Sequence, residues 1–190
     1  MTTVTSRRRP GLERAVRTAD RLFYEEGIHA VGVDRIAAEA DVSKATLYAH
    51  FRRKDDLVVH YLHARSEDWQ ATVAARLPAM ATTPEGRVLA MFDLLGEWFA
   101  EDGYRGCPFI NAQAECGSQA EVGRVAVGHR AWVRGLFAEL AAAAGAARPA
   151  ALSMQLELLY DGAMVGAQSE PELPWAEGAK GAAAILLGIG

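Results

Sequence analysis

Residues 32–58, GVDRIAAEADVSKATLYAHFRRKDDLV, decide the fold of the N-terminal part of the chain. Their apolar residues before Ala40 recur at spacings of three and four, which predicts a very short helix. After the turn ADVS, Ser43 is the expected N-cap of a helix that runs to about Phe51, because its hydroxyl can accept an otherwise unpaired backbone N–H. A short helix, a tight turn and a second helix form a helix-turn-helix.

The second of these helices has an outward face that is small and polar. At about 100° per residue, Leu47 and Phe51 lie on the core side, and residues 45, 46, 48 and 49 point away from it. Alanines let the backbone approach a partner closely, and donors at both edges suit a helix that enters a major groove of DNA. The side chains that offer these donors are Lys44, Thr46, Tyr48 and His50. The alternative is a solvated short helix in an ordinary bundle.

Charge is distributed unevenly along the chain. The net charge is -4, but residues 1–65 hold 12 Lys and Arg against 9 Asp and Glu, whereas residues 66–190 hold 8 against 15. A basic N-terminal part on an acidic remainder suits a protein that presents one face to phosphates and stays soluble through the other.

The same stretch resembles the DNA-binding signature of the tetracycline-repressor (TetR) family of transcriptional regulators. The resemblance rests on IA at residues 36–37, VS at residues 42–43, LYxHF at residues 47–51, and the lysine and leucine of KDDL at residues 54–57. It covers about the first third of the chain. The length of the chain and its helical remainder agree with it.

The resemblance implies a role for each matching position. Lys44, Thr46 and Tyr48 are expected to contact bases or phosphates, and Ala45 to lie against a base. His50 and Lys54 are expected to hold phosphates. The implied DNA-binding set is therefore Ser43, Lys44, Ala45, Thr46, Tyr48, His50 and Lys54.

Two positions depart from the pattern of the family. Gly32 stands where the family often has a capping Thr or Ser, which weakens the expectation of a phosphate contact there. Asp41 replaces the usual turn glycine, and because Asp tolerates the left-handed region better than most residues, we expect the turn to form. Upstream, SRRRP at residues 6–10 either reaches the DNA minor groove or backbone, or stays a solvated tail.

The predicted fold class is all-α, because almost every periodic segment has helical spacing. A first helix with an apolar stripe from Leu12 to Phe23 should end at Gly27 in a left-handed conformation. We assign residues 1–53 to a helix-turn-helix DNA-binding domain and residues 54–190 to a ligand-binding and dimerisation domain, linked by a helix at 54–77 that ends before a proline. The later helices are expected near 84–98, 110–115, 121–145, 149–168 and 171–187.

The C-terminal part contains aromatic and amide side chains that could line a ligand pocket. About half of them are expected to be core, because an aromatic stripe at helical spacing is core more often than pocket. The scarcity of Lys and Arg beyond Arg65 favours an apolar or aromatic, uncharged ligand over a polyanion. The candidate ligand-binding residues are Trp98, Phe99, Phe109, Asn111, Gln113, Trp132, Gln155, Tyr160 and Met164, with Gln168 as a further polar anchor.

No cofactor or metal site is predicted. Cys107 and Cys116 match no zinc or redox spacing, and we interpret them as structural thiols rather than a redox switch. His60 and His63 lie one helical turn apart without a third ligand in view. The polar, basic N-terminus resembles no secretion signal and no stretch reaches the length of a membrane span, so the cytoplasm is the expected location.

The sequence therefore predicts a homodimeric transcriptional regulator that binds a palindromic operator, acts as a repressor, and is released by a small effector. In the resembled family the last two helices form the dimer interface, and the small residues of 149–168 and 171–187 permit the close helix approach that this needs. The alternative is an all-α ligand-binding protein or enzyme. It lacks a nucleophile elbow, an HExxH, a P-loop or a dinucleotide fingerprint in the required context.

Overall fold

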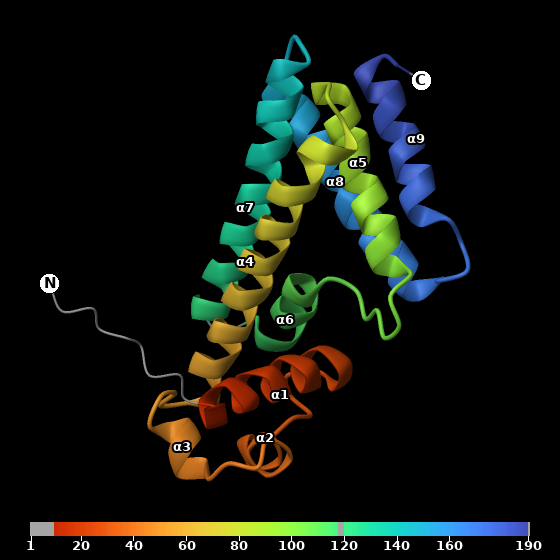
Figure 1. The fold of residues 1–190 in the computed structure, drawn as a ribbon. Coiled ribbons are helices and arrows are strands. Elements are labelled where there is room, and N and C mark those ends of the chain that lie inside the picture. Colours follow the sequence, from red (N-terminus) through yellow and green to blue (C-terminus); the bar gives the residue numbers. More distant parts are fainter. Residues whose placement is uncertain (1–9, 118–119, 190) are drawn as a thin grey trace, which may run out of the picture.

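The computed structural model describes residues 10–117 and 120–189, and these residues form helices and no strand (Figure 1), which confirms the all-α prediction. The arginines of SRRRP at residues 7–9 lie outside the described residues. The helices are α1 (Pro10–Glu26), α2 (Val33–Glu39), α3 (Lys44–Tyr48), α4 (Lys54–Met80), α5 (Pro84–Phe99), α6 (Pro108–Cys116), α7 (Ala120–Ala143), α8 (Pro149–Ser169) and α9 (Trp175–Leu187). None of the described helices is long and apolar enough to cross a membrane.

Helices α1, α2 and α3 form a small head at one end of the molecule (Figure 1). Leu22, Ile36 and Leu47, one from each helix, are fully buried and meet in its core. Helix α1 ends at Gly27, whose φ of 93° is the left-handed conformation that the sequence predicted. The head is thus a three-helix unit held together by apolar side chains at the spacing that the sequence shows.

The body, α4 to α9, extends away from the head along α4 and α7 (Figure 1). Helix α4 packs against α7, and α9 packs against α5 and α8. Phe92 of α5 and Phe137 of α7 stack with ring centroids 6.1 Å apart in the middle of this bundle. Helix α6 is short and lies between α1 and the long helices, so it touches both parts of the molecule (Figure 1).

Three predicted helix limits were wrong. Helix α3 ends at Tyr48 rather than Phe51. Helix α4 continues past Pro78 to Met80, because the proline removes one hydrogen bond close to the helix end and Ala81 resumes the pattern by donating to the carbonyl of Leu77.

The last helix also begins later than predicted, at Trp175 rather than Pro171. The backbone N–H of Leu173 donates to the carbonyl of Glu170, and so does the indole N–H of Trp175, at 3.1 Å each. The residues that were predicted to form the first turn of the last helix form this turn instead. Pro174 takes the N-cap position instead.

Candidate nucleic-acid interface and ligand cavity

Helix α3 is positioned by its cap and by one buried side chain. The hydroxyl of Ser43 accepts the backbone N–H of Thr46 at 3.1 Å, which confirms the predicted N-cap. The hydroxyl oxygens of these two residues are also 3.0 Å apart. Leu47 anchors the helix in the core of the head, and Tyr48 is 50% exposed on the opposite face. Lys44, Ala45, Ala49 and His50 are exposed as well.

The turn before α3 forms despite its unusual residue. Asp41 has a φ of 52°, the left-handed conformation that the sequence led us to expect there. Arg14 of α1 donates from Nε to the carbonyl of Ala40 and from Nη2 to the carbonyl of Asp41, at 3.0 Å each. The arginine thus fixes the turn, and with it the angle between α2 and α3. Gly32 begins α2 without a side-chain cap.

Helix α2 is fixed to α1 by exposed ion pairs. Arg35 binds both Glu26 of α1 and Glu39 of its own helix, and Arg21 of α1 binds Glu39 at 2.6 Å. The arginine hydrogen bonds lower the pKa of both glutamates, Arg35 being the first cause in each case. These pairs orient the helix that precedes the turn and lie at its solvent-facing edge.

Both lysines of the predicted DNA-binding set have partners inside the protein. The ammonium of Lys44 lies 2.6 Å from the carboxylate of Asp34, on a surface where such pairs contribute little. Lys54 donates to the carbonyl of Ile28, and its Nζ lies 5.9 Å from the centre of the Phe23 ring. Lys44 can exchange its partner for a phosphate at small cost, whereas Lys54 would have to leave a half-buried position.

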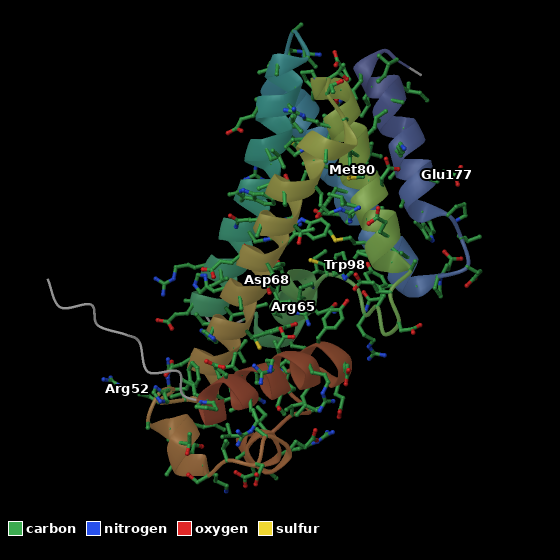
Figure 2. The ribbon with its side chains drawn as sticks, in the orientation of Figure 1. Arg52, Arg65, Asp68, Met80, Trp98 and Glu177 are labelled. Atoms are coloured by element: carbon green, nitrogen blue, oxygen red, sulfur yellow. The ribbon has the colours of Figure 1, made fainter. Side chains whose placement is uncertain are left out.

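Arg52 is a basic side chain that the sequence interpretation missed. It directly follows the α3 segment, is exposed, and projects from the head in Figure 2. In the described part of the chain it makes no ion pair. The double arginine at residues 52–53 was the available signal. Its second member is used locally, since Arg53 forms a capping box with Asp56.

The head and the body meet at the ends of α1 and α6. The phenol of Tyr24 donates to the carbonyl of Gly106 at 3.1 Å and accepts the backbone N–H of Arg105 at 3.0 Å. Arg65 of α4 makes a two-point ion pair with Asp20 of α1, at 2.7 and 2.8 Å, and lies over the Tyr24 ring. Through these contacts, a shift of α6 or α4 would also displace α1.

The far end of α6 contacts the loop between α1 and α2. The carboxylate of Glu115 accepts the backbone N–H of His29 at 2.8 Å, and the ring Nε2 of His29 lies 2.5 Å from the carbonyl of Glu115. This loop leads into α2 and the turn before α3. Helix α6 therefore joins the body to the helix-turn-helix part of the head.

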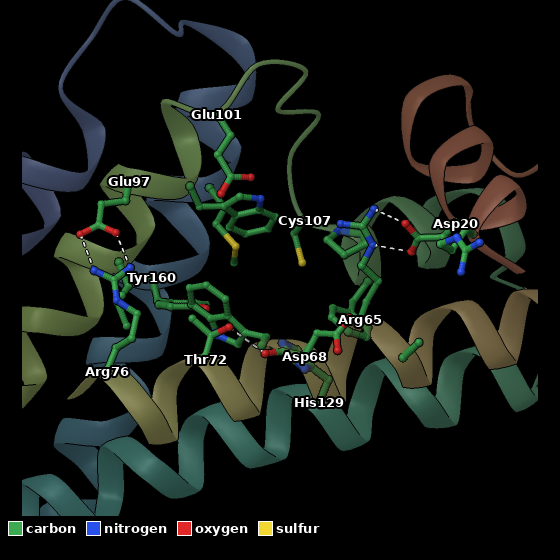
Figure 3. Close-up of a pocket in the computed structure, with 18 of the residues that line it drawn as sticks. Asp20, Arg65, Asp68, Thr72, Arg76, Glu97, Glu101, Cys107, His129 and Tyr160 are labelled. Atoms are coloured by element: carbon green, nitrogen blue, oxygen red, sulfur yellow. Dashed lines mark hydrogen bonds and ion pairs between the residues drawn. The ribbon is translucent and has the colours of Figure 1, made fainter. Parts of the chain in front are cut away.

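A cavity of about 670 Å³ opens between the head and the body, of the size that small-molecule sites usually have. Figure 3 shows side chains from α1, α4, α5, α7 and the start of α6 converging on it. Its lining residues are Val16, Arg17, Asp20, Ala64, Arg65, Asp68, Trp69, Thr72, Arg76, Leu94, Glu97, Trp98, Glu101, Cys107, Pro108, Phe109, His129, Tyr160 and Met164.

Aromatic rings make up much of this wall. The indoles of Trp69 and Trp98 lie with centroids 5.7 Å apart, and Phe109 stacks on His129 at 3.8 Å. The buried indole N–H of Trp69 lies beside the hydroxyl of Tyr160, without a hydrogen bond of good geometry among the described residues. Such surfaces bind flat or apolar molecules by excluding water.

Two titratable groups in the wall are held neutral. Burial, followed by the nearby Arg130, lowers the pKa of His129 to about 4, and its Nδ1 lies 2.9 Å from the hydroxyl of Ser66. Burial raises the pKa of the Cys107 thiol to about 11. A protonated thiol is a poor nucleophile, which agrees with the structural role predicted for Cys107. Within the described residues, no cluster of three or more His, Cys, Asp or Glu is placed to hold a metal ion.

The chain matches known proteins over both its parts. The family model "Bacterial regulatory proteins, tetR family" matches residues 15–61. A solved TetR-family transcriptional regulator from Streptomyces coelicolor is 38% identical, with a TM-score of 0.87 and 94% of each chain covered. The chain belongs to the TetR family. A second solved TetR regulator, from Streptomyces avermitilis, is 28% identical with a TM-score of 0.76, covering 91% of this chain and 97% of that one.

Curated relatives of this TetR-family protein match it over part of its length. The HTH-type transcriptional activator FasR from Mycolicibacterium smegmatis is 35% identical over 83 residues, 40% of this chain. An HTH-type transcriptional regulator from Staphylococcus aureus is 38% identical over 50 residues. The matches span 36% and 27% of the lengths of these two relatives. Family and fold together make the chain a DNA-binding transcriptional regulator of the helix-turn-helix type.

The TetR-family body brings together only some of the residues that the sequence nominated for the ligand. Trp98, Phe109, Tyr160 and Met164 line the cavity. The others do not. Phe99 packs on Tyr104, and Trp132 packs on His129. Asn111 donates to the carbonyl of Arg105. Gln113 is half-buried on α6, and Gln155 and Gln168 are exposed on α8.

The sequence interpretation missed the charged and hydroxylic part of the wall. Asp68, Thr72 and Arg76 share helical spacing with Arg65 and Trp69 on α4, so one face of that helix lines the cavity. The signal was present as a polar stripe along α4, but a stripe of this kind usually faces solvent. Its function appears only when α1 and α5 are seen to lie opposite.

Helices α8 and α9 of this TetR-family protein present large apolar side chains to solvent. With Leu173 of the turn between the helices, they form an apolar face that we define as Met154, Leu158, Val165, Leu173, Ile185 and Leu186, each at least 41% exposed. Helix α9 is held against α5 by Lys180, which makes a two-point ion pair with Asp93 at 2.6 and 2.8 Å. This contact fixes the inner side of α9 and leaves the apolar face outward.

Proposed function

We propose that this TetR-family protein is a homodimeric repressor. It binds a palindromic operator through α3 and leaves it when a small molecule with an apolar or aromatic body fills the cavity. The observation that carries this proposal is the double attachment of α6. Its first turn, with Pro108 and Phe109, lines the cavity, and its last turn, with Glu115, holds the loop at His29.

The DNA contacts that we propose follow the exposed side of α3. Tyr48, Thr46 and Ala45 would read base edges, and Lys44 and His50 would meet bases or phosphates at the borders of the groove. Ser43 supports them as the cap of α3. We also propose Lys54 as a donor to a phosphate. To bind one, it would have to leave its present partners, the carbonyl of Ile28 and the Phe23 ring.

The dimer that we propose uses the apolar face of α8 and α9. Two copies placed about a two-fold axis would cover these side chains from water, which is favourable in proportion to the apolar area buried. A dimer also doubles the operator, because each head reads only a few base pairs and two half-sites lie about one helical turn or more apart. The exposed apolar side chains and the family membership support this assembly.

Release by the ligand requires two conformations that differ in the position of the heads. A ligand that binds better to the conformation with mismatched heads weakens operator binding, and operator binding weakens the ligand by the same factor. The contact of Tyr24 with the loop before α6, and that of His29 with the end of α6, supply a physical connection for this linkage. A coupling of about 1–3 kcal/mol is typical of such switches.

The test begins with selection of duplexes from a random library by the purified protein. The proposal predicts an inverted repeat, bound by one or more dimers, whose affinity falls in the Lys44→Ala and Tyr48→Ala variants. A folded protein that enriches no sequence would reject it. FasR is described as an activator, so repression has to be distinguished from activation. A reporter behind a promoter that carries the selected site does this: expression that rises when the protein is absent identifies a repressor.

A further inference from the structure

We propose that the cavity takes an organic monocation, a protonated or quaternary amine carried on an aromatic or alkyl body. The inference rests on the proposed function only in treating the cavity as the effector site. It goes beyond that function by assigning a charge to the ligand. Some charges in the wall are already neutralised by ion pairs, and others are still available to a ligand.

Two of the three arginines in the wall are already paired. Arg65 is bound at two points by the carboxylate of Asp20, and Arg76 is bound at two points by the carboxylate of Glu97 (Figure 3). Paired, planar guanidinium and carboxylate groups use most of their hydrogen-bonding directions on one another. These two arginines are therefore poor anchors for an anionic ligand.

Two carboxylates in the wall have no such partner. No ion pair involves the side chain of Asp68 or Glu101 in the described residues. Figure 3 shows Asp68 on α4 and Glu101, just after α5, on different sides of the cavity. Both are exposed, so they stand where a ligand would enter. Arg17 on α1 is the remaining unpaired cation of the described wall, and one such charge does not offset two carboxylates.

The unpaired carboxylates lie close in the chain to the two tryptophans. Asp68 directly precedes Trp69, and the backbone N–H of Glu101 donates to the carbonyl of Trp98 at 3.1 Å. The two indoles lie with centroids 5.7 Å apart. Indole faces attract cations more than other aromatic rings do, and such contacts with organic ammonium groups strengthen as water is excluded.

No further positively charged group of the described wall repels a cation. His129 is neutral near pH 7, because burial lowers its pKa to about 4, and the Cys107 thiol is protonated. Much of the rest of the wall is apolar or aromatic and includes Phe109, Tyr160 and Met164. A cationic head and an apolar body therefore both find matching groups in the same cavity.

The test uses probes of related shape and three different charges, because the natural ligand is unidentified. Tetraphenylphosphonium, triphenylphosphine oxide and tetraphenylborate are titrated by calorimetry into the full chain. Benzyltrimethylammonium and phenylacetate serve as a smaller pair. Cation–π contact and two carboxylates together predict that the cation of at least one set binds about tenfold or more tightly than its anion.

Substitutions locate the effect. Asp68→Asn and Glu101→Gln should each weaken the cation by about two- to fivefold and leave the neutral probe unchanged. Glu67→Gln is the matched control, because Glu67 is an exposed neighbour on α4 that does not line the cavity. Circular dichroism and thermal melts check that the variants fold. Trp98→Ala should weaken both the cation and the neutral probe.

The outcomes separate this inference from the proposed function. Equal affinity for the three charges, tighter binding of the anions, or no binding of either cation would overturn the cationic ligand. A neutral or anionic compound that binds the cavity and releases operator would do so while leaving the proposed function intact. A cation that binds as predicted but leaves operator affinity unchanged would support the inference about charge and reject the regulatory role.

Discussion

The carboxylate of Glu115, at the end of α6, accepts the backbone N–H of His29 in the loop between α1 and α2, at 2.8 Å. The ring of His29 reaches back to the carbonyl of Glu115 at 2.5 Å. The two residues are 86 positions apart in the chain. At this point a helix that borders the cavity is joined to the segment that leads into the helix-turn-helix.

Glu115→Ala should reduce the coupling between the cavity and the head. The variant loses the side-chain acceptor of the His29 N–H and keeps the cavity wall, so ligand affinity in the absence of DNA should stay unchanged. The factor by which a cavity ligand weakens operator binding should fall towards one. The measurement is fluorescence anisotropy of labelled operator with and without ligand. Gln113→Ala, on the same helix, is the control, and an unaltered coupling factor in Glu115→Ala would show that this contact is only structural.

Tyr48→Ala and Lys44→Ala should each weaken operator binding by about 1–3 kcal/mol without unfolding the protein. Both side chains are exposed, and the ion pair of Lys44 with Asp34 lies on the surface. Tyr48→Ala should also relax the base preference at one position of the selected site. Arg148→Ala removes a cation from the loop before α8 as a control. Gel-shift titration at fixed salt gives the affinities, and equal affinities for all four proteins would remove α3 from the interface.

The fold of the head could be predicted from the sequence because its determinants are local. The Ser43 cap, the left-handed Gly27 and Asp41, and the buried Leu47 each follow from one residue type at one spacing. The end of α4 and the start of α9 could not be predicted, since a proline was interpreted as a helix boundary in both places. Near the end of α4 the structure tolerates the proline, and before α9 a turn around Glu170 precedes the helix.

The cavity was only partly predictable, because its wall combines segments that are distant in the chain. Aromatic residues such as Trp98 and Tyr160 could be nominated by type, but their sides in the bundle depend on helix packing. Counting Lys and Arg beyond residue 65 suggested an uncharged ligand. That count did not reveal that Arg76 is neutralised by Glu97, while the carboxylate of Asp68 has no ion-pair partner among the described residues; only the three-dimensional arrangement does so.

Stability should depend on pH through His129. Burial lowers the pKa of His129 to about 4 from its ordinary value of 6.5, so the unfolded chain binds more protons between these values. The free energy of unfolding should therefore fall as pH falls from about 6.5 towards 4, on the order of 2 kcal/mol between pH 7 and pH 5 from this group alone. Urea unfolding of the native protein and His129→Gln measures it. A pH dependence that the substitution leaves unchanged would assign the effect to other groups.

Leu158→Asp should dissociate the proposed dimer. Leu158 is 68% exposed on α8, so a charge there costs little in a monomer and is unfavourable in a covered interface. Light scattering at micromolar concentration should give a dimer for the native protein and a monomer for the variant, with operator affinity falling in parallel. Val127→Asp, on an exposed apolar position of α7, is the control. A native protein that is monomeric at this concentration would contradict the proposed assembly.

The central claim is that the cavity and the operator are linked, and reciprocal titration tests it most directly. A compound that binds one-to-one in a thermal-shift screen, and loses affinity in Trp98→Ala, is titrated into the protein with and without saturating operator. Operator is then titrated with and without the compound. The account predicts that each ligand weakens the other by the same factor, about 5- to 150-fold. A compound that fills the cavity and leaves operator affinity unchanged would contradict it.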